Sequence, residues 1–386
     1  MSLTAVGQYE QAFCQTTSLP TAYAFWKGRT ALYAILKALD IGEGDEVLVP
    51  GFTCVVVPNA VRFVGAKPVY VDIAPRTYNL DPHSVRQRIT PKTRALIVQH
   101  TFGIPAELDA LLDIARHYNL ALIEDCAHTL GSTYAGQLVG TFGQAAFFSS
   151  QWTKPYTTGL GGMAVVADSS LAQRMRLVRE GFSQPARMQR LQLRVQYTLY
   201  QRFFSPRLYW FAVGTLRRLS QCNLFVASSG QEELSGRVPH DSQWQMSDYQ
   251  AKLGLVRLRE LASDTAHRKR LTAVYEKILQ ERGWPLALSP KSAQTIYLRY
   301  PLCVANKWEL LRQAEEARIE LGSWFESVLH PIQTGLDRFG YEAGTCPIAE
   351  QTADEVINLP THPRLSVDDA ERLVTFVCQC AQPSVH

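Results

Sequence analysis

The sequence lacks most features that mark secreted, membrane-spanning or strongly charged proteins. Charged residues make up only 19% of its 386 residues, and the formal net charge is a mild +4. The start, MSLTAVGQYEQAF, has neither the basic head nor the apolar core of a signal peptide, and no apolar run reaches the length of a membrane span. The eight cysteines form no paired C-x-x-C motifs and no evident disulfide framework. We therefore expect a cytoplasmic protein with reduced thiols and no bound metal.

Short apolar runs alternate with helical patterns from about residue 28 to residue 167. Six runs are typical of strands, at 45–50, 68–73, 94–100, 120–126, 145–150 and 162–167. Continuous apolar strands separated by helices indicate a mostly parallel sheet that is covered on both faces. We predict an α/β fold with a large domain over residues 1–245. Residues 246–386 are predicted to form a long connecting helix and a smaller C-terminal α+β domain.

The polar residues that follow the predicted strands suggest a cofactor. Ligands of parallel sheets bind beyond the carboxyl ends of the strands, where Asp125 and Lys154 stand. A carboxylate can keep a pyridine nitrogen protonated, and a lysine can form an imine with an aldehyde. The first helix opens with residues 28–30, whose N–H groups can bind a phosphate, and Ser149 can add a hydroxyl. Each feature is common alone, but their order points to pyridoxal 5'-phosphate (PLP).

Longer motifs make the chain similar to one family over nearly its whole length. They are GEGDEVLVPGFT (42–53), ITPKTRALIVQHTFGIPAELDALLDIARHYNLALIEDCAHTLGSTYAGQLVGTFG (89–143), FSSQWTKPYTTGLGG (148–162), QMSDYQAKLGLVRL (245–258) and YEAGTCPIAEQTADEVINLPTHPRLS (341–366). They resemble the DegT/DnrJ/EryC1/StrS family of PLP-dependent sugar aminotransferases. The resemblance implies the three-layer, mostly parallel sheet of PLP-dependent transferase fold type I, the fold of aspartate aminotransferase.

The resemblance also implies roles for the matching residues. Lys154 matches the Schiff-base lysine that also moves the proton, Asp125 the partner of the pyridine nitrogen, and His128 a residue near the phenolic oxygen. These three are the predicted catalytic residues. The predicted cofactor-binding residues are the same three together with Gly28, Arg29, Thr30, Cys54, Ser149 and Gln243.

Three positions depart from the family pattern. The first turn reads Lys27-Gly28-Arg29 where the family usually has Ser-Gly-Thr; the backbone donors remain, and Arg29 can add charge to the phosphate site. Cys54 stands where an aromatic residue often stacks on the cofactor, which leaves Cys54 or Phe52 to cover the ring. Gln243 stands near the position of an asparagine that the partner subunit usually supplies to the phosphate.

The function implied by the resemblance is transfer of an amino group from an amino acid, expected to be glutamate, to a nucleotide-linked keto sugar. Cyclitols and other keto substrates fit as well. The active unit is expected to be a homodimer with shared sites. Two alternatives stay open: a PLP-dependent sugar dehydratase, in which histidine replaces the lysine, and a non-catalytic PLP-binding regulator or partner subunit. Lys154 argues against the first, and Lys154 with Asp125 against the second.

A basic, aromatic insertion spans about residues 182–240. No acidic residue lies between Gly181 and Gln231, a stretch that carries seven arginines and many aromatic residues. One interpretation is a helical hairpin that packs on the dimer or forms a lid. The other is peripheral contact of residues 182–231 with the inner membrane surface, near lipid-linked substrates. No nucleic-acid motif accompanies the insertion, so no nucleic-acid partner is expected.

Overall fold

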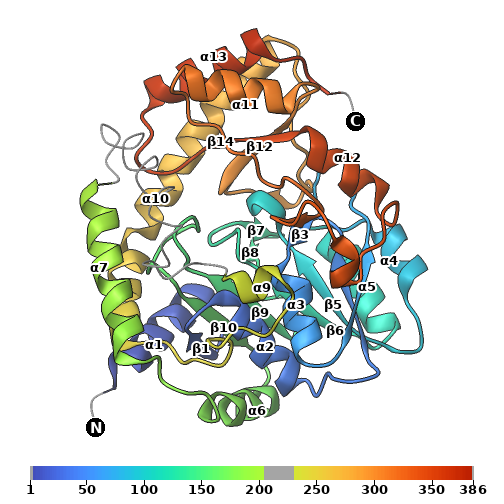
Figure 1. The fold of residues 1–386 in the computed structure, drawn as a ribbon, viewed down its shortest axis with the longest axis vertical. Coiled ribbons are helices and arrows are strands. Elements are labelled where there is room, and N and C mark those ends of the chain that lie inside the picture. Colours follow the sequence, from blue (N-terminus) through green and yellow to red (C-terminus); the bar gives the residue numbers. More distant parts are fainter. Residues whose placement is uncertain (1–2, 204–229, 385–386) are drawn as a thin grey trace.

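A seven-stranded sheet forms the centre of the molecule in the computed structural model, which describes residues 3–203 and 230–384 (Figure 1). Neighbouring strands are parallel except β10, which is antiparallel to both β9 and β1. The predicted mostly parallel sheet is confirmed. The strands, in spatial order, are β1 (Thr21–Phe25), β10 (Gly162–Val166), β9 (Ala145–Ser149), β6 (Ala121–Asp125), β5 (Thr93–Gln99), β2 (Glu46–Pro50) and β4 (Lys67–Val71).

Apolar residues on both faces of the strands explain why the runs are continuous in the sequence. Along β2, Val47 and Val49 pack with α2 (Gly28–Ala38), α3 (Val56–Phe63) and α6 (Ser169–Glu180), whereas Leu48 faces the opposite layer. That layer holds α4 (Pro82–Arg88) and α5 (Leu108–His117), and beside them α1 (Ala5–Thr17) covers β1, β10 and β9. The sheet is therefore the middle of three layers.

The C-terminal part is built around one long helix. A capping box between Ser247 and Gln250 begins α10 (Asp248–Glu281), which at about 1.5 Å per residue is roughly 50 Å long. It runs from α1 to the C-terminal elements, where it packs against α13 (Figure 1). The other C-terminal elements are β12 (Arg299–Cys303), α11 (Lys307–Glu316), η3 (Leu336–Phe339), α12 (Pro347–Glu355), β14 (Val356–Pro360) and α13 (Val367–Cys380). The division at 245/246 stays a prediction, but α10 begins beside it.

Two small strand pairings connect distant parts of the chain. β3 (Thr53–Cys54) pairs in parallel with β13 (Leu329–His330), which brings a C-terminal loop to the carboxyl ends of the central strands. A second sheet combines β7 (Thr133–Tyr134), β8 (Gln137–Leu138) and β11 (Ala293–Gln294). A 3₁₀ turn, η1 (Thr101–Gly103), follows β5.

The described part of the insertion consists of α7 (Arg187–Phe203) and α9 (Gln231–Leu234). Leu193 and Tyr197 point inward from α7, and Tyr197 lies 5.9 Å from the ring of Trp152, two residues before Lys154. Residues 204–229, on which much of the hairpin and membrane interpretations depend, lie outside the described residues. Within residues 3–203 and 230–384, no helix is long and apolar enough to cross a membrane.

Candidate active site

Lys154 lies in a loop between β9 and β10 that polar contacts hold closed. The hydroxyls of Ser150 and Thr158 lie 2.8 Å apart, and the N–H of Ser150 donates to the Gly161 carbonyl at 3.0 Å. The N–H of Lys154 donates to the Gln151 carbonyl at 3.0 Å. These bonds fix the backbone from which the lysine side chain extends.

The surroundings of Lys154 favour its neutral amine. Burial lowers its pKa to about 8. Cys54 and Asp125 oppose this shift, whereas the positive charges of Arg299 and Arg29 add to it. A neutral amine near physiological pH is what a lysine needs to attack an aldehyde or to accept a proton.

Asp125 ends β6 with a carboxylate that is only 3% exposed. Burial raises its pKa to about 6, against the hydrogen bond from the Ala127 N–H to Oδ1 at 2.9 Å and the charge of Lys154. A buried carboxylate of this kind is stabilised in its ionised form by a further positive charge. A protonated pyridine nitrogen supplies such a charge, so Asp125 fits the nitrogen of PLP.

His128 is a neutral hydrogen-bond donor in this site. The N–H of Phe102 donates to His128 Nδ1 at 3.3 Å, which leaves the ring proton on Nε2. Burial and the charge of Lys154 hold the pKa of His128 well below its usual range. Its ring stacks on Phe102 and Trp324, with centroids 6.1 and 5.8 Å away. The imidazole is therefore held in one orientation beside the lysine.

The beginning of α2 forms an anion cradle next to β9. Gly28 is the first helical residue, and a Cβ added there would lie 3.0 Å from the Cβ of Ser149. The Thr30 hydroxyl is fully buried and has no hydrogen-bond partner within residues 3–203 and 230–384. Free N–H groups at a helix start and an unpaired buried hydroxyl suit a phosphate. Gly28, Thr30 and Ser149 thus fit the phosphate group of PLP.

Two ion pairs flank this cradle. Lys27 Nζ lies 2.5 Å from Asp241 Oδ2, and Arg29 pairs with the buried Glu233. Glu233 lies near the end of the insertion and Asp241 directly after it, so this part of the chain neutralises Lys27 and Arg29, which stand where the resemblance implies serine and threonine. Arg29 was expected at the phosphate, but in this chain its guanidinium faces Glu233; a phosphate contact stays a prediction.

Cys54 and Gln243 are placed differently relative to the lysine. Cys54 is half-buried at the end of β3, opposite His330 in β13, and influences the pKa of Lys154. Gln243 is exposed, and its Nε2 donates to the Tyr33 hydroxyl at 3.2 Å. Among the residues that the structure describes, the side-chain hydrogen bond of Gln243 goes to Tyr33 and not to the lysine loop, and its contribution to a partner subunit stays a prediction.

Three site residues were missed in the sequence because they come from the C-terminal part. Lys154 Nζ lies 5.2 Å from the ring centroid of Trp324, and the Arg299 guanidinium lies 4.5 Å from the same ring. His330 lies 6.0 Å from Trp324, and burial lowers its pKa to about 4. The density of Trp, Phe and His in SWFESVLH (323–330) was the only local signal.

A buried cluster beside the site has the residue types of a metal centre but is satisfied without one. Ligand atoms of His100, Glu124 and Cys126 lie within 4.8 Å of one another. The Glu124 carboxylate accepts hydrogen bonds from three backbone N–H groups of residues 140–143. It also lies 3.1 Å from His100 Nε2, while the Ala106 N–H donates to Nδ1 of the same ring. These bonds make the cluster a support for the end of β6.

Comparisons with known proteins identify the family of the chain. GDP-perosamine synthase of Caulobacter vibrioides is 30% identical over 376 residues, 96% of this chain and 89% of that protein. L-glutamine:scyllo-inosose aminotransferase of Streptomyces griseus is 43% identical over 167 residues, 43% of this chain and 39% of that protein. The crystal structure of DesV from S. venezuelae is 26% identical with a TM-score of 0.77, covering all of this chain and 91% of that one. The family model matches residues 4–378, and the chain belongs to the DegT/DnrJ/EryC1/StrS aminotransferase family.

Proposed function

We propose that this aminotransferase uses PLP to move an amino group from an amino acid to a keto sugar that is linked to a nucleotide. The observation that carries the proposal is the meeting of Lys154, Asp125 and His128 beside the anion cradle at the carboxyl ends of the central strands. The names of GDP-perosamine synthase and of a UDP-sugar 3-aminotransferase that is 28% identical support a nucleotide-linked substrate. The S. griseus relative, by its name, favours testing cyclitol ketones and glutamine as well.

The residues have distinct tasks in this proposal. Bound PLP would supply the electron sink that makes the α-proton of the amino donor acidic. Asp125 would keep the ring nitrogen protonated, and His128 would offer its Nε2–H to the phenolic oxygen. Lys154 would bind the cofactor aldehyde and, as a free amine, accept and return the proton; with a pKa of about 8 it is partly neutral at physiological pH.

The phosphate site is proposed to be completed in a homodimer. The N–H groups of residues 28–30, the Thr30 hydroxyl and Ser149 bind the phosphate from one subunit. Gln243, exposed in one chain, is available to a second copy. Light scattering tests this model: a dimer mass is expected, and a strictly monomeric mass for the active protein contradicts the shared site.

Visible spectroscopy with product analysis tests the chemistry. Adding PLP should produce an absorption band that Lys154→Met lacks, and an excess of glutamate or glutamine should bleach it. A keto sugar nucleotide should then restore the band and yield an aminated product that carries ¹⁵N from the labelled donor. A band that neither donor changes favours the regulatory alternative, whereas loss of water without ¹⁵N incorporation favours the dehydratase.

We propose in addition that α7 contacts an anionic membrane surface. Its outer face, opposite the packed Leu193 and Tyr197, carries an apolar stripe with helical spacing: Met188, Leu191, Val195 and Leu199, which are 62%, 56%, 51% and 42% exposed. Exposed arginines of the same helix lie beside the stripe, and α7 has no acidic residue. Apolar area flanked by cations suits an anionic headgroup layer, whereas two copies meeting through this face would repel each other.

Liposome co-sedimentation at low salt tests this contact. Binding to vesicles of phosphatidylglycerol and phosphatidylcholine is expected, with loss when Leu191 and Val195 are changed to serine. A matched control changes Val238 and Val256, which are equally exposed elsewhere, to serine. Equal binding by both double variants, or no binding to anionic vesicles, contradicts the proposal.

A further inference from the structure

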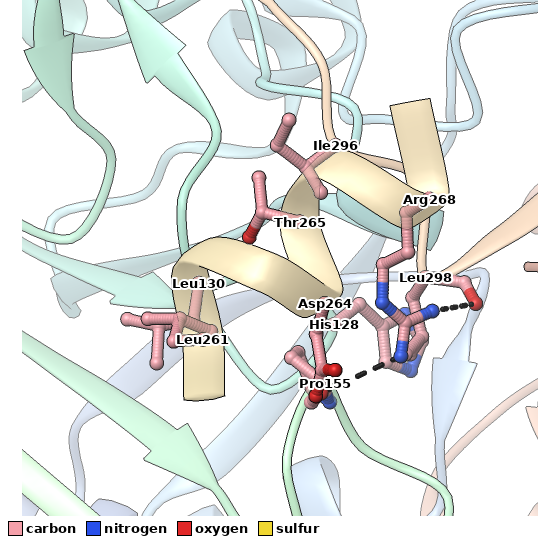
Figure 2. A pocket seen from close by; sticks show the side chains of 9 residues that line it. All are labelled: His128, Leu130, Pro155, Leu261, Asp264, Thr265, Arg268, Ile296 and Leu298. Atoms are coloured by element: carbon pink, nitrogen blue, oxygen red, sulfur yellow. Dashed lines mark hydrogen bonds between the residues drawn. The ribbon is translucent and has the colours of Figure 1, made fainter. Parts of the chain in front are cut away.

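Arg268 is a buried arginine that joins three segments around the reactive lysine. It projects from α10 and is 5% exposed. Its Nη1 donates to the Leu298 carbonyl at 3.0 Å and to the Thr361 hydroxyl at 2.7 Å, and its Nη2 donates to the Pro155 carbonyl at 3.4 Å. Figure 2 shows the guanidinium between Leu298 and Pro155, on the wall of a small pocket that His128 also lines.

The residues that Arg268 holds are direct neighbours of the active-site groups. Pro155 follows Lys154, and Leu298 precedes Arg299, whose charge lowers the pKa of the lysine. The Arg268 guanidinium therefore holds both the loop that carries Lys154 and the strand that carries Arg299. A lysine at 268 could not replace it, because an ammonium lacks the planar fork that reaches separate oxygens in fixed directions.

Burying Arg268 in this way costs free energy of folding, which indicates that the arginine has a role at the site. Burial lowers the pKa of Arg268 to about 10, and Arg299 adds to the shift, although Asp264 one turn earlier opposes it. The three bonds described end on two carbonyls and a hydroxyl, and burying a cation against neutral acceptors costs free energy. An apolar side chain would fill the same position at lower cost, but it could not bind the carbonyls beside Lys154 and Arg299.

We infer that Arg268 is a positioning residue that keeps Lys154 buried and shielded from water by binding the lysine loop to the C-terminal part. The inference rests on the proposed role of Lys154. When the bonds to Pro155 and Leu298 are lost, water reaches the lysine and its pKa rises towards that of an ordinary amine. PLP binding weakens, because less of the amine is neutral and the loop that presents it is less fixed.

The test compares Arg268→Lys with a matched control, Arg76→Lys. Arg76 also binds a backbone carbonyl, that of Leu286 at 2.8 Å, but away from the lysine loop. In the apo-proteins, the pH midpoint of Lys154 acylation, followed by peptide mass spectrometry, should move up by about one pH unit in Arg268→Lys and stay unchanged in Arg76→Lys. The dissociation constant of PLP, from visible absorbance, should rise about ten-fold in the first variant only.

The outcomes separate this inference from the proposed function. A wild-type Lys154 midpoint like that of an ordinary lysine, with no PLP band, overturns the role of Lys154 itself. Suppose that the wild type behaves as expected, but that folded Arg268→Lys keeps the Lys154 midpoint and the PLP affinity of the wild type. That result overturns the positioning role alone, even if the melting temperature of the variant falls. Should Arg268→Lys not fold, Arg268→Gln replaces it, because a glutamine also lacks the guanidinium that binds the Pro155 and Leu298 carbonyls; an upward shift of the midpoint supports the inference, and an unchanged midpoint contradicts it.

Discussion

Lys154 should react with acylating reagents at a much lower pH than an ordinary lysine. Burial lowers its pKa to about 8. At pH 7 about 9% of such an amine is neutral, compared with about 0.04% for an unperturbed lysine of pKa about 10.4. The neutral fraction is thus larger by about 200-fold, and it should level off above pH 8, where an ordinary amine is still gaining reactivity. The pH midpoint, unlike the absolute rate, does not depend on how easily the reagent enters the site.

Two substitutions should move this midpoint in opposite directions. The negative charge of Asp125 raises the pKa of Lys154, so Asp125→Asn should bring the midpoint below 8. The positive charge of Arg299 lowers the pKa, so Arg299→Gln should bring the midpoint above 8. Opposite shifts identify electrostatic effects, because a general loosening of the site moves both variants upward.

The assay is a brief acylation of apo-protein across a pH series, followed by peptide mass spectrometry. Lys307 is an internal control, because burial also lowers its pKa to about 8. Its amine donates to the Phe325 and Ala353 carbonyls, and neither Asp125 nor Arg299 contributes to its shift. Its midpoint should therefore stay constant. A wild-type Lys154 midpoint near 10.4, or shifts of the same sign in both variants, would refute the reasoning.

Three further predictions concern the cradle. Thr30→Val should weaken PLP binding about five-fold, the effect of one lost hydrogen bond, while not lowering the apo-protein melting temperature, because the hydroxyl has no partner among the residues that the structure describes. Gly28→Ala places a Cβ 3.0 Å from its neighbour and should destabilise the protein by about 1–3 kcal/mol in urea unfolding; Gly42→Ala, where the nearest atom is 3.6 Å away, should cost under about 0.5 kcal/mol. Asp241→Asn leaves the buried Lys27 without its charge partner and should cost about 3–5 kcal/mol at neutral pH; a loss below about 1 kcal/mol would show that the pair is not buried in solution.

The central strands were predictable because their burial requires runs of apolar residues that are visible in the local sequence. A strand covered on both faces needs apolar residues at every position, and the six predicted runs lie within a residue or two of the observed strands. The first helix and strand, Ala5–Thr17 and Thr21–Phe25, were missed, since polar residues interrupt the apolar pattern of the helix and the alanines and tyrosine of TAYAF are only weakly hydrophobic. Missing the strand affected the site prediction, because β1 leads directly into the beginning of α2, where the anion cradle lies.

The residues of the candidate active site also fall into two groups, those that local sequence predicted and those that it did not. Asp125 and Lys154 follow predicted strands, so local sequence placed them, and the structure sets them close enough for each to shift the pKa of the other. Arg299 and Trp324 lie more than a hundred residues further along the chain. They reach the lysine through pairing between β3 and β13 and through the contacts of β12. A local sequence pattern does not predict contacts between segments that lie so far apart in the chain.

This division has a consequence for substrate choice. In the proposed function, Lys154, Asp125 and the α2 cradle bind the cofactor, which is the same for every keto substrate. Arg299, Trp324 and His330 approach the same lysine from the C-terminal part, and the proposal gives them no contact with the cofactor. We therefore expect differences in the keto substrate between this enzyme and its relatives to map to residues 296–330. An exchange of this segment should change the preferred acceptor while the pH midpoint of Lys154 stays near 8, provided that the exchanged segment keeps a cation at position 299.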